Sequence, residues 1–217
     1  LFAGYALQTV GLQYTSASKA GFITGLSVAL VPILSAILLR RPPSPAVVIG
    51  VCLATMGLAL LTLNHDFRVA TGDVMVLGCA LSFALHIVSV SAFAPSMDPL
   101  GLTIVQVATV ALLSAAISLL IPGPWPTPSP SALWAAAFTG ILATALAFAV
   151  QTSAQRFTTP THTALIFAGE PVFAAIFGVL LAGDVMTPAA VAGGVLIVLG
   201  TVVNEIRWAE RTPSGVV

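Results

Sequence analysis

Long runs of apolar residues, separated by short segments rich in proline, glycine and charge, dominate this chain. A helix needs roughly 20 apolar residues to cross a bilayer core of about 30 Å. Runs that approach this length lie near Leu1 to Leu12, Ala20 to Leu39, Ala46 to Leu63, Val74 to Ala94, Leu100 to Ile121, Ala132 to Thr152, Thr163 to Ala182 and Ala189 to Val203. The pattern predicts an all-α integral membrane protein with about eight transmembrane helices, whose charged breaks lie outside the hydrocarbon.

The composition excludes a water-soluble globule. Charged residues make up 6% of the chain and hydrophobic residues 58%, whereas a soluble surface carries roughly 25 to 35% charge. A nucleic-acid-binding surface is excluded as well, because the net charge is zero and Lys and Arg do not cluster. The sequence has no phosphate-binding loop, no His-Glu-x-x-His and no Cys-x-x-Cys. We therefore expect no metal and no cofactor, and a process driven by a gradient or by exchange.

Basic residues on alternate loops predict the orientation of the chain. Eight spans leave both termini on one side of the membrane. One set of loops holds Arg40, Arg41, Arg156, Arg207 and Arg211, and the other set holds Lys19 and Arg68. Because basic loops stay in the cytoplasm, we expect both ends of this chain to be cytoplasmic, in the cytoplasmic (inner) membrane, with residues 207–217 as a tail.

The chain contains an internal repeat. At an offset of 143 residues, Gln8-Thr9 aligns with Gln151-Thr152, and the register continues without a gap through three helices. Identities in this register include Thr15 with Thr158, Ile23 with Ile166, Ile33 with Ile176, Pro45 with Pro188, Gly50 with Gly193 and Gly57 with Gly200. Five spans, an odd number, separate a position from its counterpart, so equivalent helices must cross the membrane in opposite directions. Inverted repeats of this kind are typical of secondary transporters.

The repeat also predicts the domain organisation. Residues 1–64 hold three helices of a first repeat, and residues 72–206 hold five helices of a second repeat. The helices that begin near Val74 and Leu100 precede the matched trio of the second repeat, and the first trio has no counterparts for them here. We hypothesise that two helices, or roughly 70 residues, precede Leu1 in a five-plus-five carrier.

The sequence resembles the EamA-type permeases of the drug/metabolite transporter superfamily. The resemblance is strongest from Phe138 to Val203 and most specific in Gly169-Glu170-Pro171-Val172-Phe173-Ala174-Ala175. It implies ten helices in two inverted halves, cytoplasmic termini and movement of small metabolites without nucleotide hydrolysis. Two departures are evident, because the Leu-Gly-Glu that usually ends the fourth and ninth helices reads Leu39-Arg40-Arg41 and Ala182-Gly183-Asp184 here.

Glu170 is the only acid inside a predicted span. A charge at that depth costs about 2.5 to 3.5 kcal/mol, so Glu170 either carries a proton, pairs with a cationic substrate or bonds freed backbone. Pro171 and Pro32 each remove a backbone donor and predict a helix break in the two equivalent helices. The counterpart of Glu170 is Ser27, so any proton step is asymmetric.

Other polar and small residues within the spans are further candidates. His86 could relay a proton or contact substrate, or be a neutral, satisfied histidine. Gln8, Gln106 and Gln151 suit a polar cavity or bonds between helices. Small residues that predict close helix packing are Gly21, Gly25, Gly50, Gly57, Gly193 and Gly200.

These features favour a secondary transporter that moves a small metabolite or drug-like solute by alternating access, rather than an enzyme. Its expected partners are the lipid bilayer, a small-molecule substrate and protons, and a homodimer is left open. One alternative is a structural or receptor-like membrane subunit. Another is an intramembrane enzyme that uses His86 with Ser82 or Ser89 on one helix face.

Overall fold

The computed structural model describes residues 1–62, 70–120, 127–183 and 185–209. Every regular element within these ranges is helical. The predictions that involve Arg68, Asp184 and Arg211, and the end of the first repeat beyond residue 62, fall outside the described residues.

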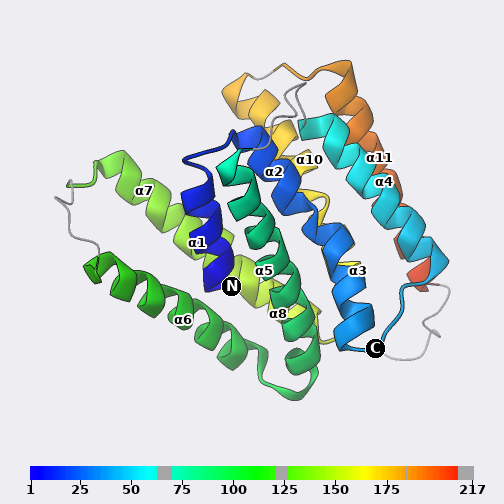
Figure 1. Ribbon diagram of the computed structural model, residues 1–217, viewed down its shortest axis with the longest axis horizontal. Helices are drawn as coiled ribbons and strands as arrows, with labels where there is room; N and C mark the ends of the chain where they lie inside the picture. Colours follow the sequence, from blue (N-terminus) through cyan, green and yellow to red (C-terminus); the bar gives the residue numbers. More distant parts are fainter. Residues whose placement is uncertain (63–69, 121–126, 184, 210–217) are drawn as a thin grey trace. The chain divides into compact units, whose positions relative to one another are not determined.

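The helices follow the eight predicted runs (Figure 1). Their order is α1 (Phe2–Gly11), α2 (Ala17–Gly25), α3 (Ser27–Leu38), α4 (Pro45–Thr62), α5 (Thr71–Phe93), η1 (Ala94–Ser96), α6 (Pro99–Leu120), α7 (Pro130–Phe138), η2 (Thr139–Leu146), α8 (Ala147–Ala154), α9 (Pro160–Phe167), α10 (Glu170–Phe177), η3 (Gly178–Ala182) and α11 (Pro188–Ala209). Among the described residues, six helical stretches are long and apolar enough to cross a membrane, and Pro188–Asn204 is a shorter apolar helix. The predicted all-α membrane fold is confirmed.

The chain divides into two compact units. One unit comprises residues 1–2 and 89–158, and the other comprises residues 3–88 and 159–217. Helix α5 runs from the second unit into the first. Each unit is described by itself below.

Equivalent helices begin at equivalent residues. The side chains of Ser16 and Thr159 accept hydrogen bonds from the backbone N–H groups of Lys19 and His162, at 3.3 Å and 3.2 Å. Ser44 and Thr187 cap α4 and α11 in the same way. Each cap satisfies a backbone donor that the first turn of a helix leaves without a partner. All of these pairs keep the offset of 143 residues, so the repeat extends to the hydrogen bonds that start each helix.

Equivalent helices also end alike. Arg40 and Gly183 are the described residues with positive φ angles, 54° and 74°, and they occupy equivalent positions. A left-handed residue commonly ends a helix, and glycine is preferred there because it has no Cβ. In the first repeat, Arg40 therefore stands where the resemblance expects glycine, and it takes the conformation that glycine would take.

The centre of the larger unit is the crossing of α4 and α11, which lie side by side (Figure 1). A Cβ added at Gly50 would lie 2.7 Å from the carbonyl oxygen of Gly200, and one added at Gly57 would meet the carbonyl oxygen of Gly193. Since Gly50 faces Gly200 and Gly57 faces Gly193, the two equivalent helices run antiparallel around a local two-fold axis. This contact is the inverted arrangement that the odd number of spans predicts.

The remaining two predicted packing glycines differ from each other. A Cβ at Gly25 would collide with the side chain of Leu58 on α4, so Gly25 lies at a helix contact. A Cβ at Gly21 would meet nothing within 4 Å, and Gly21 is exposed. The packing role expected for Gly21 is therefore wrong for this structure. The two residues of the Gly-x-x-x-Gly pattern are not equivalent, because only Gly25 turns toward α4.

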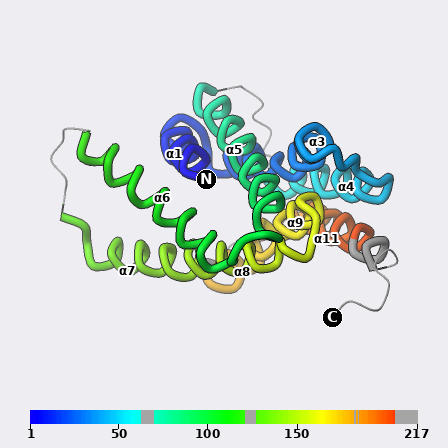
Figure 2. Tube along the Cα trace, turned by 90° about the horizontal axis from the view of Figure 1, so that it is seen from below, coloured from blue at the N-terminus to red at the C-terminus, as the bar shows by residue number. Residues whose placement is uncertain are grey.

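In the smaller unit, α6 contacts α8 and η2 (Figure 2). Thr103 and Thr152 are buried, whereas the apolar surfaces of α7 and η2 are almost fully exposed. In a bilayer such surfaces face lipid or other helices, since apolar side chains gain nothing from contact with one another over contact with lipid.

Candidate functional site

Two equivalent helices are interrupted at the same repeat position. The first break lies at Leu26, between α2 and α3, and the second lies at Ala168 and Gly169, between α9 and α10. Pro171 follows the second break directly, at the start of α10. Pro32, by contrast, lies inside α3, well past the first break. The expected break at Pro32 is corrected to Leu26, because the surrounding helices hold α3 in helical form at the proline.

The second break frees a backbone carbonyl. The N–H of Gly169 bonds to the carbonyl of Ile166 instead of that of Leu165. The hydroxyl of Thr201 on α11 donates to the Leu165 carbonyl at 3.2 Å and replaces the lost bond. At the first break, Leu26 N–H is shared between the carbonyls of Phe22 and Ile23, at 3.2 Å and 3.1 Å. In a membrane each polar backbone group needs a partner, and the second break meets this need through a neighbouring helix.

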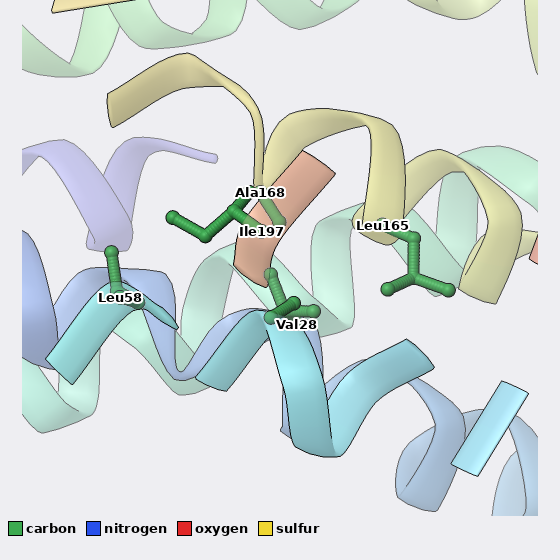
Figure 3. Close-up of a cluster of buried hydrophobic side chains, with 6 residues drawn as sticks. Val28, Leu58, Leu165, Ala168 and Ile197 are labelled. Carbon is green, nitrogen blue, oxygen red and sulfur yellow. The ribbon is translucent and has the colours of Figure 1, made fainter. Parts of the chain in front are cut away.

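The two breaks share one hydrophobic cluster (Figure 3). Val28, in the first turn of α3, and Ala168, at the second break, belong to a buried cluster with Leu58, Leu165 and Ile197. Ala54, the counterpart of Ile197 in the repeat, completes the cluster. The interruptions therefore lie beside the crossing of α4 and α11, on both sides of the local two-fold axis.

Glu170 begins α10, immediately after the second break. Its side chain is exposed in the structure rather than enclosed by other helices. The N-terminal end of a helix favours a negative charge, which helps to keep a carboxylate in an apolar segment. The stretch Thr71–Ser96 extends further toward the N-terminus than predicted and contains Asp73 in its first turn. Glu170 is thus not the only acid within a candidate span, although it is the one at a helix break.

The smaller unit contains a chain of buried side-chain hydrogen bonds. Gln151 Nε2 donates to Gln155 Oε1 at 2.9 Å, and Gln155 Nε2 donates to Ser91 Oγ at 2.7 Å. Nearby on the same helices, Gln106 Nε2 donates to Thr152 Oγ1 at 3.2 Å. Buried carboxamides that bond to one another join helices and can also re-pair with a polar solute.

The predicted site residues do not form one cluster within either unit. Gln106 and Gln151 belong to the smaller unit, whereas Glu170, His86 and Gln8 belong to the larger one. His86 on α5 and Gln8 on α1 are both partly buried.

Sequence reasoning missed two buried polar residues. Gln155 is 1% exposed and links Gln151 to Ser91. His162 is buried in the first turn of α9. The four-residue spacing of Gln151 and Gln155, which places both on one helix face, was an available signal for the first. His162 fell just before the run that begins at Thr163, and a cap at Thr159 would have included it.

The structure bears on the enzyme alternative through Ser82. Its hydroxyl donates to the carbonyl of Gly78 one turn earlier on α5, at 2.8 Å. Such a bond within the helix is the usual state of serine in a transmembrane segment. Ser82 is therefore bound to backbone rather than poised beside His86.

Comparison with known proteins agrees with this architecture. The profile of the EamA-like transporter family matches residues 1–63 and 70–205. The chain belongs to the EamA-like transporter family. An uncharacterized transporter of Archaeoglobus fulgidus is 32% identical over 206 residues, which cover 95% of this chain and 66% of that relative. This chain thus spans 66% of the length of that EamA relative.

A protein of known crystal structure has a similar fold. It aligns with a TM-score of 0.79 and 22% sequence identity, over 98% of this chain and 75% of its own. At this identity the likeness shows the fold alone. Together, the EamA match and the apolar helices establish a multi-pass membrane protein of a transporter family.

Proposed function

We propose that the protein is a secondary transporter that moves a small metabolite or drug-like solute across the cytoplasmic membrane by alternating access. The observation that carries the proposal is the pair of helix breaks at equivalent repeat positions, beside the antiparallel crossing of α4 and α11. Discontinuous helices in inverted repeats are where many carriers hold substrate and coupling ions.

The breaks give an apolar segment polar chemistry. The Leu165 carbonyl is held by one hydroxyl, that of Thr201, which is a bond that can be exchanged for one to a solute. Because the repeats point in opposite directions, a conformation of one half that opens the site to one side is matched by a conformation of the other half that opens it to the opposite side.

Glu170 is the group that we propose for coupling. It lies at the deeper of the two interruptions, and the equivalent position in the other half is Ser27, so only one half can bind a proton or a cation in this way. A carboxylate there either carries the coupling proton or pairs with a cationic group of the substrate. Proton movement down a potential of 100 mV supplies about 2.3 kcal/mol per charge.

The experiment uses the intact protein in proteoliposomes. A panel of amino acids, nucleosides and cationic drugs is first screened for thermal stabilisation, since a ligand that binds the folded state raises the melting temperature. Uptake of a stabilising compound is then measured with an imposed pH gradient and in exchange mode, for the parent, Glu170→Gln and the control Asp98→Asn. Asp98 is an exposed acid at the start of α6.

Each coupling role predicts a different result. A proton carrier requires Glu170→Gln to lose gradient-driven uptake and keep exchange. A counter-ion requires the variant to lose both modes and the stabilisation by cationic compounds. Unchanged uptake in both modes removes Glu170 from the site, and the absence of uptake or exchange of any panel compound by the parent counts against the transporter proposal.

We further propose that both ends of this chain are cytoplasmic. Gln13 and Arg156 are exposed, occupy equivalent repeat positions and flank helices of opposite direction. A membrane-impermeant maleimide should label Gln13→Cys from outside intact cells and Arg156→Cys only after the cells are opened. Labelling of both from the same side would contradict the inverted topology.

A further inference from the structure

Helix α8 carries a shallow apolar groove on its outer face. Its lining residues are Ala149, Val150, Ser153, Ala154 and Phe157. Val150 and Phe157 are 61% and 81% exposed, so nothing among the described residues of this unit covers the groove. The question is what fills it.

The repeat provides a direct comparison, because α1 is the counterpart of α8 and its corresponding face is covered. Gly4 and Gly11 of α1 are buried, and Cβ atoms added to them would collide with Phe83 and Val76 of α5. Tyr5 also packs edge-on against the ring of Phe83, with the ring centroids 5.6 Å apart. The start of α5 is thus pressed against the end of α1, and its later turns lie against the beginning of α1.

The groove on α8 is the uncovered counterpart of this α5-binding face. Leu7 of α1 lies beside Gly78 of α5, and Gly11 and the backbone of Tyr14 lie beside Gly72. The equivalents of these three α1 residues are Val150, Ala154 and Phe157, and all three line the groove. Ala147 and Ala154, the equivalents of the buried Gly4 and Gly11, are exposed. The same face is therefore filled in one repeat and empty in the other.

A hydroxyl group marks the end of the groove. On the covered side, Thr15 Oγ1 donates a hydrogen bond to the carboxylate of Asp73, in the first turn of α5. The same carboxylate accepts the N–H of Ala70 at 2.8 Å. On the uncovered side, the equivalent residue is Thr158, whose Oγ1 is buried and has no hydrogen-bond partner among the described residues. Because a buried hydroxyl without a partner costs free energy, this atom indicates an acceptor that belongs beside it.

We propose that the groove seats a membrane-spanning helix of the α5 type, encoded upstream of Leu1, whose first turn carries an acid that accepts the hydrogen bond of Thr158. The helix runs antiparallel to α8, as α5 runs antiparallel to α1. It crosses less closely than α5 does, because Ala154 stands where Gly11 lies in the other repeat. The result is a second Thr–carboxylate bond, on the membrane face opposite to that of Thr15 and Asp73.

The source of this helix follows from the order of the repeat. In the second repeat, α5 precedes the trio that begins with the α8 segment, so its counterpart must precede the trio that begins with α1. About a third of the Archaeoglobus fulgidus relative lies outside its match to this chain, which is enough for such a helix. A second copy is disfavoured as the donor, because its α5 is already packed on its own α1.

The test is site-specific photocrosslinking in membranes that contain the protein expressed from its complete reading frame. The photoreactive residue p-benzoylphenylalanine replaces Phe157 in the groove, and the crosslinked peptides are identified by mass spectrometry. The matched control is the same replacement at Tyr14, the equivalent position on α1. Tyr14 should crosslink to the first turns of α5, near Gly72 and Asp73.

The proposal expects the Phe157 variant to crosslink within its own polypeptide to an upstream segment that has an acid in its first helical turn. Thr158→Val should reduce that yield, while Thr15→Val should reduce only the yield at Tyr14. Adducts to lipid alone, to a second copy or to a described helix of the same chain would each overturn the proposal. If the Phe157 variant does not accumulate, p-benzoylphenylalanine at Val150 gives the same set of outcomes.

Discussion

The crossing of α4 and α11 allows a quantitative test of the antiparallel arrangement. Gly50→Ala would place a Cβ 2.7 Å from the Gly200 carbonyl oxygen, and Gly200→Ala would place one 2.6 Å from the Gly50 carbonyl oxygen. Ordinary contact begins at 3.4 Å, so the two backbones must separate by several tenths of an ångström. Both obstacles are backbone atoms of a packed helix, which cannot rotate away as a side chain can.

The expected net cost is about 1–2 kcal/mol for each substitution. Overpacking a tight contact costs about 1–3 kcal/mol, and replacement of a helical glycine by alanine returns roughly 0.5–1 kcal/mol through helix propensity. Gly21→Ala is the matched control, because it makes the same change inside a helix with nothing within 4 Å. It should be neutral or stabilising by about 0.5–1 kcal/mol.

Unfolding of the purified protein in mixed micelles, titrated with sodium dodecyl sulfate and followed by circular dichroism, measures these differences. The double variant Gly50→Ala with Gly200→Ala should lose less than the sum of the single losses, because one separation of the helices relieves both collisions. Equal stability of Gly50→Ala and Gly21→Ala would refute the close antiparallel crossing. Strict additivity in the double variant would show that the two residues do not face each other.

Two further predictions concern helix ends. Arg40→Gly should raise the free energy of unfolding by about 1 kcal/mol, since Arg40 has a φ of 54°; Arg41→Gly removes the same charge and should not stabilise the protein. Asp73→Ala should destabilise by about 2–3 kcal/mol, because it removes both a cap and the bond from Thr15; Asp98→Ala removes a cap alone and should cost about 1 kcal/mol. The same micelle titration measures all four variants, and equal losses for the two aspartates would show that the Thr15 bond adds nothing.

The amino-acid sequence alone determined the membrane class, the helices and the repeat. Apolar runs of bilayer length have one stable structure in lipid, because a helix satisfies its own backbone. The offset of 143 residues also determined equivalent caps at Ser16 and Thr159, since a cap depends on a side chain three residues before the N–H that it bonds. These are local interactions, and local sequence is sufficient to predict them.

Contacts between distant residues were decided only by the tertiary structure. Proline at position 32 predicts a break, yet α3 continues through it and the interruption is at Leu26. Gly21 and Gly25 look alike in the sequence, but only Gly25 contacts α4. The partner of Gln155 is Ser91, which lies 64 residues away. Lipid is as apolar as a helix surface, so hydrophobicity cannot specify which face of a membrane helix packs; the fit of small residues and polar partners decides it, and that fit exists only once the helices are assembled.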